Sequence, residues 1–192
     1  MHVHKPGRFF LVAFIAILVV IAADQASKWL VLETMLRTKS ENPDFWAWFS
    51  TRDLIGDFVD QREAYNTITY TPWLNFTMVW NKGVSFGMFG GENALPPIVF
   101  IGFSLVVSMG MMVWLVLARS KTLSIALPLI IGGAIANSID RFRFGAVADF
   151  IDVHVGDKHW PAFNLADSCI VLGACFIVLD ALLTAMHKKP QQ

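Results

Sequence analysis

Two aspartates in this chain occupy positions where a carboxylate is costly. Asp167 comes just before the uncharged run "CIVLGACFIVL", and Asp149 lies in the alternating stretch "VADFIDVHV" (147–155). Because successive strand residues point to opposite faces, Asp149 shares a face with apolar residues. Asp152 and His154 share the other face, which we expect to meet water. A carboxylate in an apolar setting needs a partner, so we predict that Asp149 and Asp167 lie together.

Two close carboxylates have the chemistry of an acid and a base. They cannot easily carry two negative charges, so the pair shares one proton. One member can then activate a water while the other donates a proton to a carbonyl, as in an aspartic protease. The sequence has no His-Glu-x-x-His and no phosphate loop. Its histidines lack metal-ligand spacing with cysteine or glutamate, so we expect neither a metal nor a cofactor.

The composition indicates that a membrane holds these residues. Of the 192 residues, 55% are hydrophobic and only 16% are charged, whereas a soluble domain has about 25% charged residues. The net charge of zero argues against a nucleic-acid partner. Crossing a bilayer takes about 20 apolar residues, and four stretches are long enough: 9–32, 98–118, 122–141 and 163–186.

The short basic flanks of these stretches predict the topology. Lysine and arginine prefer the cytoplasmic side, and four crossings bring all three basic clusters to that side: Lys5 with Arg8, Arg119 with Lys121, and Lys188 with Lys189. Both termini are therefore predicted to be cytoplasmic, with segments 33–97 and 142–162 facing outward. The first stretch also resembles a cleaved signal peptide, but its apolar pattern resumes after Lys28, which favours a retained span.

The predicted fold is a single membrane domain over residues 1–192, mainly α, with four transmembrane helices. Within the first outward segment, "TITYTPWLNFTMVWNKGVSFG" is rich in Thr, Trp, Phe and Val. It reads as one or two strands that end at Gly83 and Gly87. We therefore expect a small β-rich element on the outer side of a four-helix bundle.

Three of the predicted spans carry one polar ridge each, near the outer face. The ridges are satisfied most simply in lipid if they point at one another. Each ridge also has a purely structural interpretation: a local ion pair in the first, neutralisation of a carboxylate by Arg141 in the second, and a helix N-terminal cap in the third. The ridges are Asp24 and Lys28, then Asn137, Asp140 and Arg141, then Asn164 and Asp167.

Five sequence blocks, in this order, resemble the lipoprotein signal peptidase (signal peptidase II) family: "DQASKWLV", "NKGVSFG", "GGAIANSIDR", "VADFIDV" and "FNLADS". The resemblance implies that Asp149 and Asp167 are the catalytic pair. It implies supporting or substrate-binding roles for a further set: Asp24, Lys28, Asn81, Gly83, Asn137, Asp140, Arg141 and Asn164. The family pattern has glycine where this chain has Ala136, and segment 33–66 has no counterpart that we can name. Within that segment, "FWAWF" (45–49) suits the membrane interface.

The resemblance also implies a function and a location. The family comprises aspartic endopeptidases of the bacterial inner membrane, which remove the signal peptide of prolipoproteins by cutting before a diacylglyceryl-modified cysteine. Membrane lipid and a globomycin-type inhibitor are then expected partners, the active site is expected at the outer leaflet, and we expect a monomer.

Two other function classes also use polar residues in membranes. A proton-coupled transporter or channel subunit uses them as a relay, and a non-catalytic scaffold uses them as structural contacts. A transporter predicts polar residues at mid-membrane and often internal repeats. Here the polar residues gather at one edge and no repeat is visible, and a scaffold has no need for Asp149 on an apolar face. These features favour the protease.

Overall fold

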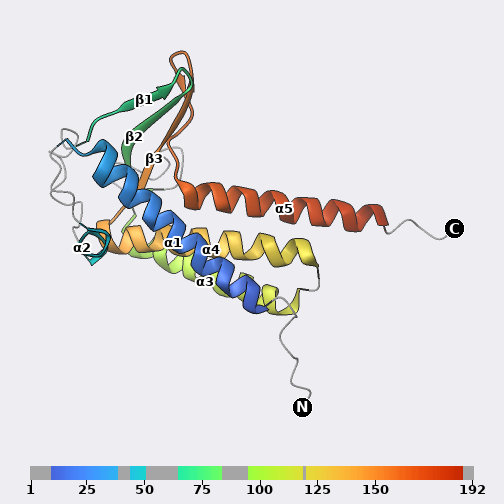
Figure 1. Ribbon diagram of the computed structural model, residues 1–192. Coiled ribbons are helices and arrows are strands. Elements are labelled where there is room, and N and C mark those ends of the chain that lie inside the picture. The colour runs from blue at the N-terminus through green and yellow to red at the C-terminus, as the bar shows by residue number, and fades with distance from the viewer. Residues whose placement is uncertain (1–9, 39–43, 51–64, 84–94, 119, 188–192) are drawn as a thin grey trace.

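The computed structural model describes residues 10–38, 44–50, 65–83, 95–118 and 120–187, and it is a helical bundle with a small sheet at one end (Figure 1). The long helices are α1 (Phe10–Trp29), α3 (Pro97–Leu117), α4 (Lys121–Phe144) and α5 (Leu165–His187). A π-helix, η1 (Leu30–Leu36), directly continues α1, so the first helical segment runs past residue 32. These four segments are long and apolar enough to cross a membrane, which confirms the predicted fold class.

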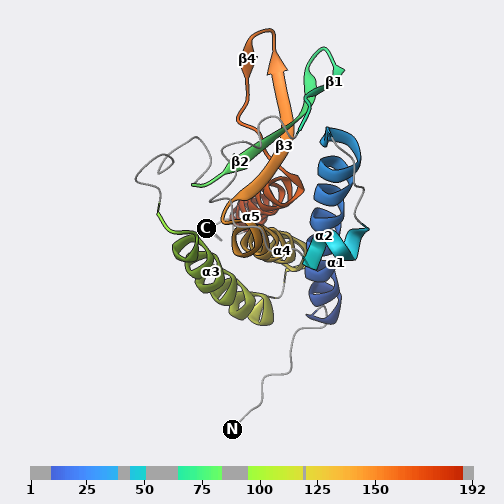
Figure 2. The ribbon, with the colours of Figure 1, turned by 90° about the vertical axis from the view of Figure 1, so that its left-hand side faces the viewer.

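Helix α4 is the centre of the bundle and packs against α1, α3 and α5 (Figure 2). Its glycines permit this close packing. A Cβ on Gly133 would lie 2.5 Å from the carbonyl oxygen of Ala166 on α5, and a Cβ on Gly132 would lie 2.8 Å from Cβ of Val20 on α1. The two glycines therefore allow α1 and α5 to pack closely against α4, so that the polar ridges of the three helices meet.

This packing predicts the effect of a single methyl group. Gly133→Ala should destabilise the protein by about 1–3 kcal/mol, because the added Cβ must displace backbone of α5. The measurement is the thermal unfolding midpoint in detergent. Gly102→Ala on α3 is the matched control, since nothing lies within 4 Å of a Cβ at that position. Equal midpoints for the two variants would show that α5 is not held against Gly133.

The sheet has four antiparallel strands in the order β1-β2-β3-β4. Strands β1 (Ile68–Thr71) and β2 (Leu74–Asn81) come from the first predicted outward segment, and β3 (Val147–Val155) and β4 (Lys158–His159) come from the second. Gly83 lies just beyond β2, whereas Gly87 lies outside the described residues. In the β2–β3 pairing Val79 lies opposite Asp149, which fixes where that carboxylate sits along the sheet.

The prediction that the Asp152 face of β3 meets water is wrong. Ala148 and Phe150 on that face are buried against Leu32 and Leu36 of η1. Asp152 itself is only 7% exposed, and its carboxylate accepts hydrogen bonds from Asn75 Nδ2 at 3.0 Å and from His159 Nδ1 at 2.8 Å. The physical reason is that η1 extends the first helix far enough to cover the second face of the strand.

A short helix, α2 (Phe45–Ser50), packs at the end of the bundle that carries the sheet. Asp44 caps it, because its side chain accepts the backbone N–H groups of residues 46 and 47. Trp48 is buried in a cluster with Phe144, the last residue of α4, and Ala146, two residues beyond it. The "FWAWF" stretch thus packs α2 against the end of α4, and Trp46, which is 74% exposed, lies outside the buried cluster beside the rings of Phe45 and Phe49.

Candidate active site

Asp167 is held in the first turn of α5 by a reciprocal cap. The backbone N–H of Asp167 donates to Asn164 Oδ1 at 2.9 Å, and the backbone N–H of Asn164 donates to Asp167 Oδ2 at 3.2 Å. This exchange between residues three apart satisfies two otherwise unpaired N–H groups at the helix start. The cap predicted for the third polar ridge is therefore present, and it fixes the direction of the Asp167 carboxylate.

Asp149 is brought to the same place from β3. Its Oδ1 accepts from Asn164 Nδ2 at 2.7 Å, and its Oδ2 accepts from Asn81 Nδ2 at 3.1 Å. Asn137 Nδ2 on α4 donates to Asp167 Oδ1 at 2.8 Å, and Asn164 Nδ2 also reaches Asn137 Oδ1 at 3.2 Å. Asparagines therefore connect two carboxylates that lie on different elements, β3 and α5.

The environments of the two carboxylates differ. Asp149 is 1% exposed, whereas Asp167 is partly exposed. Burial and, next, the nearby Asp167 carboxylate together raise the pKa of Asp149 to about 8, against the opposing hydrogen bonds from Asn81 and Asn164. Asp149 therefore holds a proton at neutral pH. An uneven pair of this kind supplies an acid and a base in one site.

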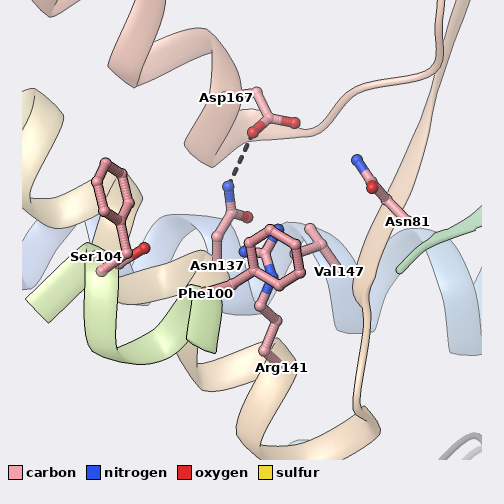
Figure 3. A pocket seen from close by; sticks show the side chains of 8 residues that line it. Asn81, Phe100, Ser104, Asn137, Arg141, Val147 and Asp167 are labelled. Carbon is pink, nitrogen blue, oxygen red and sulfur yellow. Dashed lines mark hydrogen bonds between the residues drawn. The ribbon is translucent and has the colours of Figure 1, made fainter. Parts of the chain in front are cut away.

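A cavity of about 180 Å³ opens beside Asp167 (Figure 3). Since one water takes up roughly 30 Å³ in the liquid, the cavity has room for a water and part of a substrate. Arg141 lies on its wall and donates from Nη2 to the carbonyl oxygen of Gly83 at 3.1 Å. The described lining residues come from β2, β3 and three helices: Asn81, Phe100, Phe103, Ser104, Asn137, Arg141, Val147 and Asp167.

Beneath the carboxylate pair lies a fully buried ion cluster. Lys28 Nζ is 2.7 Å from Asp24 Oδ2 and 2.6 Å from Asp140 Oδ2, and all three side chains have no exposed surface. The ion pair within the first ridge is thus present, and it reaches a second helix. Lys28, not Arg141, neutralises Asp140, because adjacent helix residues face different sides. Arg141 instead lines the cavity together with Asp167, the carboxylate with which it interacts most strongly.

This cluster connects directly to the backbone around the pair. Asp24 Oδ1 accepts the N–H of Ala166 at 2.9 Å, and Asp140 Oδ2 accepts the N–H of Ala148 at 3.1 Å. Ala148 and Ala166 are the residues immediately before the two aspartates of the pair. The Lys28 ammonium therefore binds the carboxylates of Asp24 and Asp140. Each of these carboxylates fixes the backbone next to one aspartate of the pair.

The structure brings together all the residues that the sequence singles out for the site: Asp149, Asp167, Asp24, Lys28, Asn81, Gly83, Asn137, Asp140, Arg141 and Asn164. Sequence reasoning missed Gln25 and Arg143, which join the buried ion cluster. The only sequence signal for Gln25 was its place beside Asp24. Within the described residues, no group of three or more His, Cys, Asp or Glu side chains is arranged to hold a metal ion.

Comparisons with known proteins agree on one family. Residues 16–183 match the sequence model described as "Signal peptidase (SPase) II". A lipoprotein signal peptidase of Methylorubrum extorquens is 37% identical over 89% of this chain and 85% of its own length, and one of Coxiella burnetii is 38% identical over 80% and 99%. The fold matches a solved bacterial membrane enzyme with a TM-score of 0.71 at 22% identity, over 100% of this chain and 99% of that one.

Proposed function

Because the chain belongs to the signal peptidase II family, we propose that Asp149 and Asp167 are the catalytic pair with which it removes signal peptides from prolipoproteins. The observation that carries this proposal is the shared contact with Asn164, which binds an oxygen of each carboxylate, and Asp167 of this pair lines the cavity. The transporter alternative has no support from the relatives, which are named lipoprotein signal peptidases.

The two carboxylates have different roles in the proposed mechanism. Asp167, which lines the cavity, takes a proton from a water as that water attacks the scissile carbonyl carbon. Asp149 donates its proton to the carbonyl oxygen, which the raised pKa of this buried acid supports. Asp167 then returns a proton to the leaving nitrogen as the C–N bond breaks, and Asp149 takes a proton back from a hydroxyl of the intermediate as the carbonyl re-forms. Asn137 and Asn164 keep both carboxylates oriented throughout.

The proposed substrate is defined more closely than the family name alone implies. The cut falls before a diacylglyceryl-modified cysteine, with the acyl chains in surrounding membrane lipid, and a globomycin-type inhibitor competes for the same site. The cationic wall at Arg141 suits backbone carbonyls of an extended peptide, and Asn81, Gly83 and Asn137 complete that wall. The enzyme acts as a monomer.

The proposed location is the bacterial inner membrane, with both termini cytoplasmic and the site at the outer leaflet. In support, the start of α1, the adjoining ends of α3 and α4, and the end of α5 all lie at the end of the bundle away from the sheet (Figure 1). The basic clusters flank these ends. Apart from Lys121, their side chains lie outside the described residues.

The test of function is a cleavage assay. Purified protein is incubated with a prolipoprotein that carries diacylglyceryl-cysteine, and the product is identified by mass. We expect a shortened product that begins at the modified cysteine, an uncut unlipidated precursor, and inhibition by globomycin. A folded enzyme that leaves the lipidated precursor intact would contradict the proposal.

The rate of this reaction should depend on pH in a bell shape. Catalysis needs Asp149 protonated, so the rate should fall tenfold per unit as pH rises through the pKa of about 8. At low pH the pair takes a second proton and the base is lost, which gives a rising limb on the acid side. Both apparent pKa values belong to the pair. Initial rates at saturating substrate test this, and a rate that still rises through pH 9 would exclude Asp149 as the acid.

A further inference from the structure

Arg143, at the outer end of α4, is a buried cation that the proposed mechanism does not use. It is 5% exposed, and its guanidinium carbon lies 4.2 Å from the ring centroid of Trp48, 5.0 Å from that of Phe49 and 4.4 Å from that of Phe144. It also donates to the backbone carbonyl of Trp48. Aromatic faces stabilise a desolvated cation, so α2 provides the pocket in which this guanidinium is held.

From this pocket Arg143 reaches inward to Gln25. Arg143 Nη1 donates to Gln25 Oε1 at 3.2 Å. Because the Gln25 oxygen accepts from Arg143, its amide nitrogen is turned toward the ion cluster, where it donates to Asp140 Oδ1 at 2.9 Å and Asp24 Oδ2 at 3.2 Å. The opposite amide orientation would set an oxygen against two carboxylates. Arg143 therefore fixes which way Gln25 points.

Arg143 is also the cation next to the cluster. Lys28 provides one positive charge against the two carboxylates of Asp24 and Asp140, and the Arg143 guanidinium lies on the other side of Gln25, whose amide bridges it to these carboxylates. Glu33, which also faces Arg143, has its own partner in Arg37 at 2.7 Å. An uncompensated buried charge is strongly unfavourable. Loss of Arg143 should therefore shift the two carboxylates away from the backbone N–H groups of Ala148 and Ala166 that they accept.

We infer that Arg143 is a positioning residue for the catalytic pair and that α2 is the element that locks it in place. The inference rests on the proposed function. The chain of contacts runs from Trp48 to Arg143, to Gln25, to the two carboxylates of the ion cluster, and to the N–H groups of Ala148 and Ala166. It gives α2 a role in catalysis although none of its residues lines the cavity.

The experiment compares tryptophans on one helix. Trp48→Ala should lower kcat for a lipidated prolipoprotein about tenfold and leave KM within about twofold, because the pair is misplaced while the substrate wall is intact. Trp46→Ala, at the 74% exposed position of α2, should leave both constants unchanged. Equal effects of the two substitutions would overturn the inference.

Substitutions of the cation complete the test. Arg143→Met should lower kcat by roughly tenfold to a hundredfold, and Arg143→Lys, which keeps the charge, should recover much of that loss. The double variant with Trp48→Ala and Arg143→Met should have nearly the same kcat as Arg143→Met alone, since both substitutions break the same contact between Trp48 and Arg143. Fully additive losses, or an unchanged kcat in folded Arg143→Met, would overturn the inference.

The readouts separate this inference from the proposed function. If Arg143→Met does not fold, the comparison of Trp48→Ala with Trp46→Ala decides alone. A wild-type enzyme that leaves the lipidated precursor uncut would overturn the proposed function itself. If the wild-type enzyme cleaves the lipidated precursor and all the variants have its kcat, only the role of Arg143 and α2 is overturned.

Discussion

Asp149→Asn and Asp167→Asn should each abolish cleavage of a lipidated prolipoprotein while the protein still folds. Asparagine has nearly the same shape and can keep the contacts with Asn164, but it neither carries a negative charge nor exchanges a proton. Loss of the acid or of the base removes the step that the pair performs together, so each single variant should lose at least about a thousandfold in kcat. The double variant should be little worse than either single one.

The measurement is product formation in single-turnover conditions, with the thermal unfolding midpoint as a check on folding. Asp157→Asn is the control, since the same chemical change falls on an exposed turn between β3 and β4 and should leave the rate unchanged. If a folded Asp149→Asn or Asp167→Asn variant kept a tenth of the wild-type rate, that aspartate would not be a member of the catalytic pair.

Much of the site could be predicted because each sequence pattern that indicates it spans only a few neighbouring residues. Alternation in "VADFIDVHV" set Asp149 on the face that Asn164 and Asn81 meet. Spacings of three and four residues set one polar ridge on each of three helices, and in lipid such ridges have only each other as partners. The four apolar helices followed from length and composition alone.

What the sequence could not predict depends on contacts between distant segments. Arg143 meets Gln25 across 118 residues and the Trp48 carbonyl across 95, and no periodicity encodes either meeting. The second face of β3 was assigned to water because Asp152 and His154 are polar, yet η1 covers that face. In both cases a neighbour that is remote in sequence decided the burial of a charged or polar side chain.

Lys28→Met should be the most damaging substitution outside the catalytic pair. It keeps an unbranched chain in a fully buried position but removes the ammonium between Asp24 and Asp140, whose side chains are also without exposed surface. Breaking a buried ion cluster from one side costs about 3–5 kcal/mol, because charge is left unpaired. The thermal unfolding midpoint in detergent should fall sharply. Activity should fall at least about a hundredfold, since both members of the pair lose their backbone support.

A compensated variant separates lost charge from lost packing. Asp24→Asn and Asp140→Asn, added to Lys28→Met, remove both carboxylate charges, yet an asparagine oxygen at each position can still accept the N–H of Ala166 or Ala148. The triple variant should therefore recover most of the unfolding midpoint that Lys28→Met loses. If it is as unstable as Lys28→Met alone, packing of the lysine stem and not its charge holds the cluster. If Lys28→Met alone matches the wild type in midpoint and rate, the ammonium does not hold the two aspartate segments together, and another contact must position Asp149 and Asp167.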